Sequence, residues 1–150
     1  MKKVTWIAAS LAVVISAVNI LFAQAPTPIA VVRDPGCGCC MNWVAHLEKA
    51  GFKATVAESS DMDGVKDARG VPAQARSCHT ATVGGYVIEG HVPAADVRRL
   101  LAERPAIAGL AVAGMPAGSP GMEVPGVAVQ PFDVLAFDKA GKTRVFASHR

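Results

Sequence analysis

Aromatic residues are scarce in this sequence. Phe, Trp and Tyr together make up 5% of the 150 residues, whereas the chain holds 14 Gly and 10 Pro. This composition argues against a helical bundle and predicts a compact fold with long irregular segments. The length is sufficient for one domain with its own core.

Several motifs of well-understood chemistry are also missing. No Gly-rich phosphate loop follows a predicted strand as such loops require, and no Ser-His-Asp set or pair of carboxylates can be argued from position. The chain has no internal repeat and only four cysteines. These absences leave the cysteines as the main indication of chemistry.

The first 25 residues have the pattern of a secretory signal peptide. Lys2 and Lys3 precede a largely apolar run over 6–22, and residues 23–25 read Ala-Gln-Ala, a small-residue cleavage motif. An uncleaved membrane anchor is the alternative, but the run is near the lower limit for a span. We therefore expect export, cleavage after Ala25 and no stable membrane insertion afterwards.

The charge of the expected mature chain is nearly balanced. Two of the 15 Lys and Arg residues lie in the segment to be removed, so 13 remain against 12 Asp and Glu, a net charge of +1. No basic patch remains that would indicate nucleic acid as a partner.

Three cysteines lie within four residues, directly after the turn-forming sequence Asp-Pro-Gly at 34–36. Cys37 and Cys40 have the Cys-x-x-Cys spacing, which at a helix start places both thiols on one side of the first turn. The free backbone N–H groups there favour thiolate. In an oxidising compartment four cysteines would by default form two disulfides. The third sulfur, from Cys39, makes this crowded stretch more typical of a site.

The hydrophobic pattern predicts a β-α-β unit, a helix, a β-hairpin and a further helix. The expected strands cover 29–33, 52–56, 80–83, 86–89, 132–137 and 143–147, and the expected helices cover about 39–50, 60–69 and 93–103. The order up to residue 104 is that of a thioredoxin-like α/β fold. We expect a core over 29–104 and an extension over 105–150 that ends in a β-hairpin.

In a thioredoxin-like fold the turn with the Cys-x-x-Cys pair is faced by the loop that enters the third strand. That loop carries a cis-proline in thioredoxins, whereas here it reads Ser-Cys-His-Thr at 77–80. Cys78 should therefore reach the cluster of Cys37, Cys39 and Cys40, so that two distant segments form one four-sulfur site.

Residues 106–131 contain too much Gly and Pro for regular structure. A long irregular loop in a compact domain is usually functional or disordered. Its methionines, Met115 and Met122, are either packing residues or soft ligands in a lid over the cysteines.

Taken together, these motifs resemble one family, the CopG-like periplasmic copper-resistance proteins, also described as a metal-binding domain of unknown function. The resemblance covers about residues 29–149 and rests on the sequences at 37–40, 77–80, 84–86, 89–93 and 114–123. It implies a thioredoxin-like fold, a periplasmic location, copper as the ligand of the cysteines, and a role in copper tolerance. Copper redox handling or thiol-disulfide chemistry is the implied activity, and whether the protein is an enzyme stays open.

The ligand types favour copper over zinc. Thiolates and thioethers select Cu(I), although four thiolates can also form a closed structural zinc site. A Cys-x-Cys-Cys run with one distant cysteine is not the usual pair of zinc knuckles, and adjacent cysteines suit bridging sulfurs and more than one Cu(I). His79 is a candidate ligand or hydrogen-bonding neighbour, and His91 ranks below it.

Three functions remain open. The first is a copper-binding protein that stores, passes on or changes the oxidation state of copper, with copper ions and other periplasmic copper-handling proteins as partners. The second is a thiol-disulfide oxidoreductase in which Cys37 attacks and Cys40 resolves. The third is an exported domain stabilised by disulfides or zinc. We expect Trp43 in the core, His46 on a solvent-facing helix surface and no special role for His149.

Overall fold

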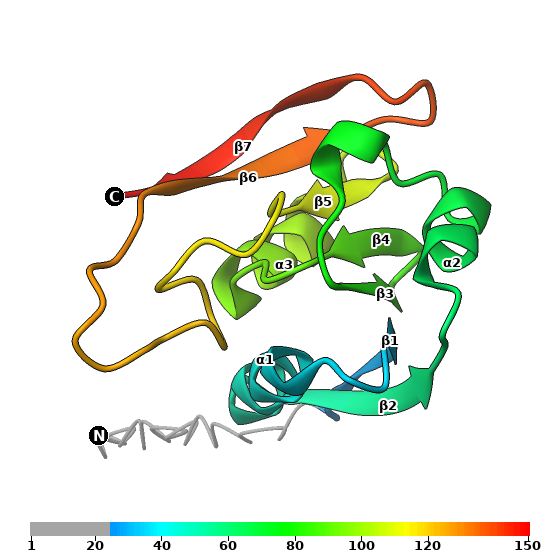
Figure 1. Ribbon diagram of the computed structural model, residues 1–150. Coiled ribbons are helices and arrows are strands. Elements are labelled where there is room, and N and C mark those ends of the chain that lie inside the picture. Colours follow the sequence, from blue (N-terminus) through cyan, green and yellow to red (C-terminus); the bar gives the residue numbers. More distant parts are fainter. Residues whose placement is uncertain (1–24) are drawn as a thin grey trace, which may run out of the picture.

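The computed structural model describes residues 25–150, which form a mixed α/β fold (Figure 1). Its strands are β1 (Thr27–Arg33), β2 (Phe52–Glu58), β3 (His79–Val83), β4 (Tyr86–Glu89), β5 (Gly109–Ala111), β6 (Phe132–Phe137) and β7 (Thr143–His149). Its helices are α1 (Gly38–Lys49), α2 (Met62–Ala68) and α3 (Ala94–Glu103), with a 3-10 turn at Ala73–Ala75. Among these helices none is long and apolar enough to cross a membrane. The expected signal peptide lies outside the described residues apart from Ala25.

In the described part of the chain the strands form one seven-stranded sheet in the order β2-β1-β3-β4-β5-β6-β7. The β1–β2 and β4–β5 pairs are parallel and the other pairs are antiparallel. The predicted parallel pairing of 29–33 with 52–56 is confirmed, and so is the C-terminal hairpin.

Strand β5 was not predicted. It has three residues, too few for a periodic signal, and it joins the hairpin of β6 and β7 to the rest of the sheet. At Gly109 a Cβ atom would collide with the backbone carbonyl of Val87, so this position requires glycine.

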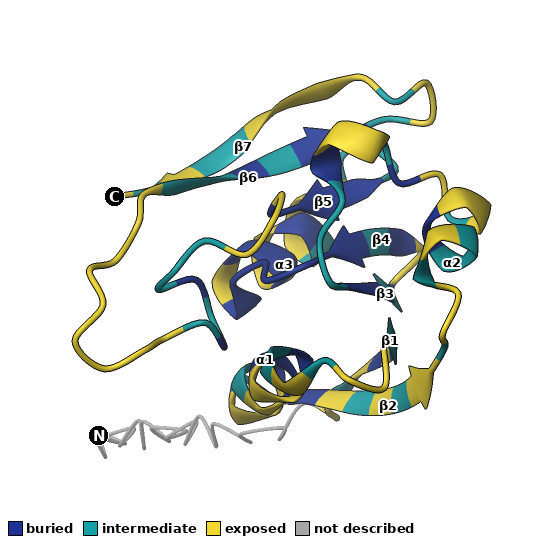
Figure 2. Cartoon of the chain, viewed as in Figure 1, coloured by how far each residue is buried: buried dark blue, intermediate teal, exposed yellow. Residues whose placement is uncertain are grey.

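Both α1 and α3 pack against one face of the sheet and share a core with it (Figure 2). The inner face of α1 consists of Cys40, Trp43, Val44 and Leu47, and Gly51, with φ of 86°, ends the helix as predicted. Alternation along β3 turns His79 toward Trp43 and Thr80 toward Lys66 of α2. The helix α2 therefore lies on the opposite face of the sheet.

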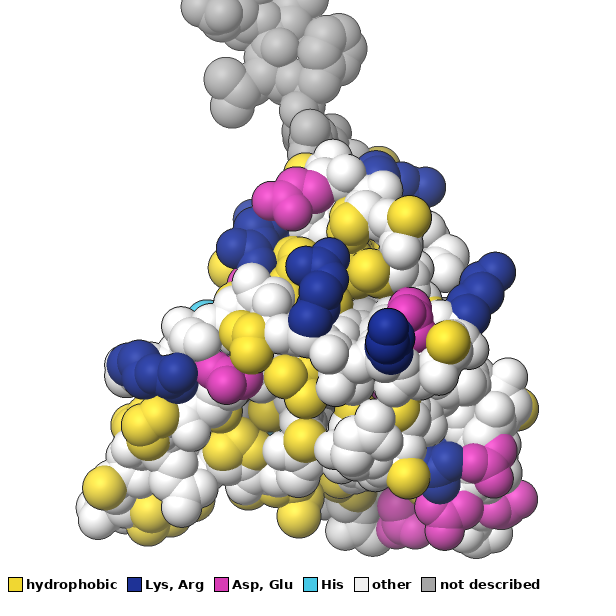
Figure 3. All heavy atoms as spheres, turned by 90° about the horizontal axis from the view of Figure 1, so that it is seen from above, with side chains coloured by type: hydrophobic (Ala, Val, Ile, Leu, Met, Phe, Trp, Pro, Cys, Tyr) yellow, Lys and Arg dark blue, Asp and Glu magenta, His cyan; other side chains and the backbone are white. Residues whose placement is uncertain are grey.

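The Lys and Arg side chains do not form a patch on the face seen in Figure 3. They stand apart from one another, whereas several acidic side chains gather at the lower right of this view. The absence of a nucleic-acid partner stays a prediction.

Candidate metal centre

The first cysteine segment is a turn held by Arg33, the last residue of β1. Its Nη1 atom donates hydrogen bonds to the carbonyl oxygens of Asp34 (3.0 Å), Pro35 (3.1 Å) and Cys37 (3.1 Å). Its Nη2 atom pairs with Glu58 at the end of β2. One guanidinium thus gathers three carbonyls of the turn that leads into α1, a role that the sequence alone did not suggest.

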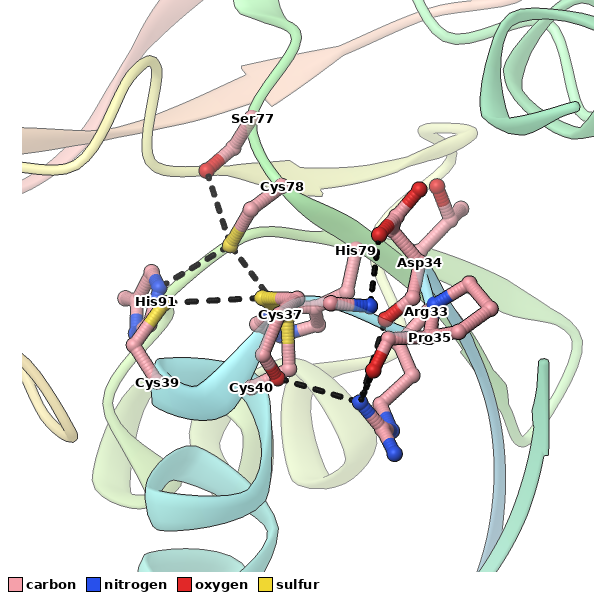
Figure 4. The surroundings of a disulfide bond; sticks show 12 residues. Arg33, Asp34, Pro35, Cys37, Cys39, Cys40, Ser77, Cys78, His79 and His91 are labelled. Atoms are coloured by element: carbon pink, nitrogen blue, oxygen red, sulfur yellow. Dashed lines mark hydrogen bonds between the residues drawn. A yellow bond between two sulfur atoms is a disulfide. The ribbon is translucent and has the colours of Figure 1, made fainter. Parts of the chain in front are cut away.

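The four sulfur atoms meet between this turn and the entrance of β3 (Figure 4). Cys37 and Cys40 form a disulfide, whereas Cys39 and Cys78 are free thiols. All four Sγ atoms lie within 4.8 Å of one another, and those of Cys37 and Cys39 are 3.5 Å apart. The predicted convergence of the two segments is confirmed.

Two imidazoles flank the sulfur of Cys78. The Sγ atom lies 3.2 Å from Nδ1 of His79 and 3.1 Å from Nε2 of His91, and these three atoms form a second group that could hold a metal. Both rings are fully buried. The sequence ranked His91 below His79, but the structure brings both rings to the same thiol.

The orientation of the His91 ring is set by the irregular C-terminal segment. Its Nδ1 atom lies 2.8 Å from the carbonyl oxygen of Pro120. Because a carbonyl only accepts, Nδ1 carries the proton and Nε2 presents its lone pair to Cys78. Anchoring of the second ring nitrogen by a carbonyl is typical of metal-binding histidines.

Burial controls the charge of these groups. It lowers the pKa of His79 to about 3, helped by the nearby His91 and Lys66, and it lowers the pKa of His91 as well. Burial, followed by the charge of Cys39, raises the pKa of Cys78 to about 11. At neutral pH both rings are therefore neutral and Cys78 is a thiol, which must lose its proton to bind a metal.

The segment after β5 lies against the site. Gly114 accepts a hydrogen bond from the Ser77 hydroxyl, and a Cβ atom at Gly121 would lie 2.6 Å from the backbone nitrogen of Trp43. The segment thus contacts both the Cys78 loop and the start of α1. Met115 is 53% exposed and Met122 is half-buried, and ligation by either thioether stays a prediction.

The other singled-out residues have structural contacts. Trp43 is buried as predicted, and its Nε1 atom donates to the carbonyl of Val92 at 2.9 Å. His46 is not simply solvent-facing, because it is half-buried and its Nε2 atom accepts from the Ala94 backbone nitrogen at 3.1 Å. His149 contacts Asp96 at 2.8 Å and so joins β7 to α3.

These donors fit copper. Sulfur ligands select Cu(I), and neutral imidazoles suit copper and zinc alike. The Nε2 atom of His79 is buried without a hydrogen-bond partner in the described structure. The disulfide form offers two thiols and two imidazoles, and reduction of the disulfide would raise the number of thiols to four.

Comparisons with known proteins relate the chain to a family. A model of a protein family of unknown function, DUF411, matches residues 75–122, while a comparison with curated proteins finds no match. Two solved structures, described as forms 2 and 1 of copper resistance protein copG, are both 46% identical in sequence. Each match covers 83% of this chain. It covers 99% of the form 2 chain with a TM-score of 0.78, and 98% of the form 1 chain with a TM-score of 0.77. At this identity and coverage, the chain belongs to the family of copper resistance protein CopG.

Proposed function

We propose that the chain is a periplasmic copper-binding protein that holds Cu(I) on Cys37, Cys39, Cys40 and Cys78 and acts in copper tolerance. The observation that carries the proposal is the meeting of four sulfur atoms, from two distant segments, within 4.8 Å. The description of two relatives as copper resistance proteins supports copper as the metal. The expected signal peptide, cleaved after Ala25, supports the periplasmic location.

The thioredoxin-like fold is part of the same proposal. It is supported by the order β1-α1-β2-α2-β3-β4-α3 and by the parallel pairing of β1 with β2 beside an antiparallel β3–β4 hairpin. We assign the core to 29–104 and the extension to 105–150.

More than one Cu(I) per chain is expected. Four closely spaced thiolates can bridge between ions, and Cu(I) favours low-coordinate sulfur. His79 and His91 add nitrogen ligands at the buried end of the site, and Met115 and Met122 are candidates to shield the exposed end. Zinc is the less favoured metal.

The disulfide allows copper redox chemistry. Oxidation of the thiols of Cys37 and Cys40 to a disulfide releases two electrons and two protons, which would reduce two Cu(II) to two Cu(I). The reverse reaction would take two electrons from two Cu(I) and two protons from solvent. Both directions balance with copper alone as the redox partner.

The proposal is tested by copper titration. Protein reduced and purified without air is titrated with Cu(I) against a competing chelator, and its metal content is measured. We expect saturation above one equivalent, and the Cys78→Ser variant should keep its fold but lose most of the affinity. Saturation at one equivalent contradicts a cluster, and an absence of binding overturns the function. Met62→Leu serves as the control, because it removes a thioether sulfur from α2 and leaves the cysteine group intact.

A thiol-disulfide oxidoreductase is the second candidate. The disulfide itself favours it, since Cys37 is half-buried and open to attack whereas Cys40 is fully buried. The adjacent free thiols of Cys39 and Cys78 argue against it, because they would compete for a mixed disulfide. The test is whether the Cys78→Ser variant still reduces the disulfide of a protein substrate. Unchanged reducing activity in this variant would favour the oxidoreductase over copper binding.

A further inference from the structure

A buried ion pair lies under the segment that carries Cys78. The Nζ atom of Lys66 in α2 is 2.7 Å from Oε1 of Glu89 at the end of β4, with side chains 4% and 0% exposed. Burial of two charges has a desolvation cost that their attraction does not reliably offset. The pair therefore calls for an explanation other than stability.

Glu89 also holds the backbone and side chains around Cys78. Its Oε1 atom accepts the backbone N–H of Ser77 at 2.7 Å, and its Oε2 atom accepts the Thr80 hydroxyl at 2.6 Å. Lys66 donates to the same hydroxyl at 3.1 Å. One carboxylate thus fixes both ends of the four-residue segment 77–80, with Cys78 and His79 between them.

Glu89 holds the segment 77–80 from the face of the sheet opposite the one on which the sulfur atoms lie. It is the cross-strand partner of Thr80, whose side chain is turned toward α2, whereas His79 is turned toward Trp43. Its carboxylate is consequently engaged by residues on the α2 face, away from the side on which the rings and the sulfurs meet.

The residues that follow Glu89 complete the contact with the loop. Gly90 has φ of 67°, and a Cβ atom there would lie 2.5 Å from the side chain of Ser77, so only glycine allows β4 to end so close to the loop. His91 then places its Nε2 atom 3.1 Å from Cys78 Sγ. The run Glu89-Gly90-His91 contacts the Cys78 segment through each of its three residues.

We propose that Glu89, neutralised by Lys66, is a positioning residue that fixes the Cys78 thiol for metal binding. The expected effect on Cu(I) affinity rests on the proposed function, whereas the expected effect on the reactivity of the Cys78 thiol does not depend on copper. The ion pair is then a means of bringing two acceptor oxygens beneath the segment 77–80.

The test compares two double variants in which the charge pair is removed. Lys66→Met with Glu89→Leu fills the space with apolar groups and removes both acceptors. Lys66→Met with Glu89→Gln is the matched control, because the amide oxygen still accepts from Ser77 and the amide N–H still bonds to Thr80. Neither variant leaves an unpaired buried charge.

Two readouts are measured in each variant. One is the rate at which Cys78 reacts with a thiol reagent, in oxidised protein carrying Cys39→Ser so that Cys78 is the remaining free thiol. The other is Cu(I) affinity in the reduced protein with all four cysteines. We expect the Leu variant to react several-fold faster and to lose about tenfold or more in affinity, the usual cost of removing a group that orients a metal ligand. The Gln variant should stay near wild type.

A folded Leu variant with unchanged thiol reactivity and affinity would overturn the proposal. If that variant does not fold, Glu89→Asp, which withdraws the oxygens by one carbon while keeping the charge, is judged by the same two readouts. Asp96→Asn, at a buried carboxylate that contacts His149, should change neither readout whatever it does to stability. Absence of Cu(I) binding by the wild type would refute the proposed function, and the thiol reaction would still test Glu89.

Discussion

The two cysteine segments, 34–40 and 77–80, are each held by an ion pair, one at the surface and one buried. Each is tied through its backbone to a charged side chain that has a counterion: Arg33 with Glu58 at the first turn, and Glu89 with Lys66 at the second segment. Glu58 is 51% exposed, whereas Glu89 is fully buried. An exposed pair contributes little and a buried pair is costly to break.

This difference suits the proposed copper redox function. The first segment carries the Cys37–Cys40 disulfide, and under that proposal its sulfur atoms separate and rejoin as the oxidation state changes. The second segment holds Cys78 between two buried imidazoles, which keeps its sulfur atom in a fixed position. The comparison predicts that damage to the second segment costs more than equivalent damage to the first.

The largest effect is expected from Lys66→Met alone. This change leaves the Glu89 carboxylate buried without its counterion, and breaking a buried pair in this way costs roughly 3–5 kcal/mol. Urea unfolding measures the loss, which the second change Glu89→Gln should largely restore. A loss under about 1 kcal/mol would mean that water reaches Glu89 and that the pair behaves like a surface pair.

Acid should also destabilise the second segment in copper-free protein. Folding lowers the pKa of His79 from 6.5 to about 3 and also lowers that of His91. The unfolded chain therefore binds more protons below about pH 6.5, so this stability is complete above that pH and is lost as the pH falls toward 3. The loss should reach roughly 3–5 kcal/mol. His79→Phe should flatten this pH profile of unfolding, and an unaltered profile would contradict the assignment to His79.

At the first turn, Arg33→Met should have a smaller effect. Met keeps the apolar stem but lacks the guanidinium, so the hydrogen bonds to three carbonyl oxygens and the pairing with Glu58 are lost. Residues 34–36 of the turn are exposed, so water can replace these bonds. We expect a loss of roughly 1–2 kcal/mol together with faster reduction of the Cys37–Cys40 disulfide by a small dithiol. Unchanged reduction kinetics would show that Arg33 does not restrain the turn.

The smallest effect is expected from Glu58→Gln. Its pairing with Arg33 is at the surface, so the change should cost about 0–1 kcal/mol and leave copper stoichiometry unchanged. If it costs as much as Lys66→Met, the contrast between the two segments fails.

Much of this site could be predicted from local pattern. The spacing of Cys37 and Cys40 after a turn, and the order of strands and helices, were enough to expect Cys78 beside them. The role of His91 was underrated because its ring direction depends on the positive φ of Gly90 and on the carbonyl of Pro120, 29 residues further on. Neither is visible in a periodic pattern.

The roles of Lys66 and Glu89 could not be inferred in the same way. A lysine in a short helix and a glutamate at a strand end are ordinarily solvated. Their burial arises because α2 lies on the face of the sheet opposite α1, where Thr80 and Glu89 also point. The signal in the sequence was the polar pair Thr80 and Glu89 in a hairpin that is otherwise largely apolar.

The sequence by itself determined the mixed α/β class, the meeting of the four sulfur atoms and the family, because turn residues, hydrophobic period, element order and cysteine spacing can be seen in it. Tertiary structure decided which groups surround Cys78 and which charges hold each segment. The contacts of Cys78 with His91, of Lys66 with Glu89 and of His91 with Pro120 join residues 13 to 29 positions apart, and their strength depends on burial. Burial is a property of the assembled sheet and helices, and no single stretch of the chain specifies it.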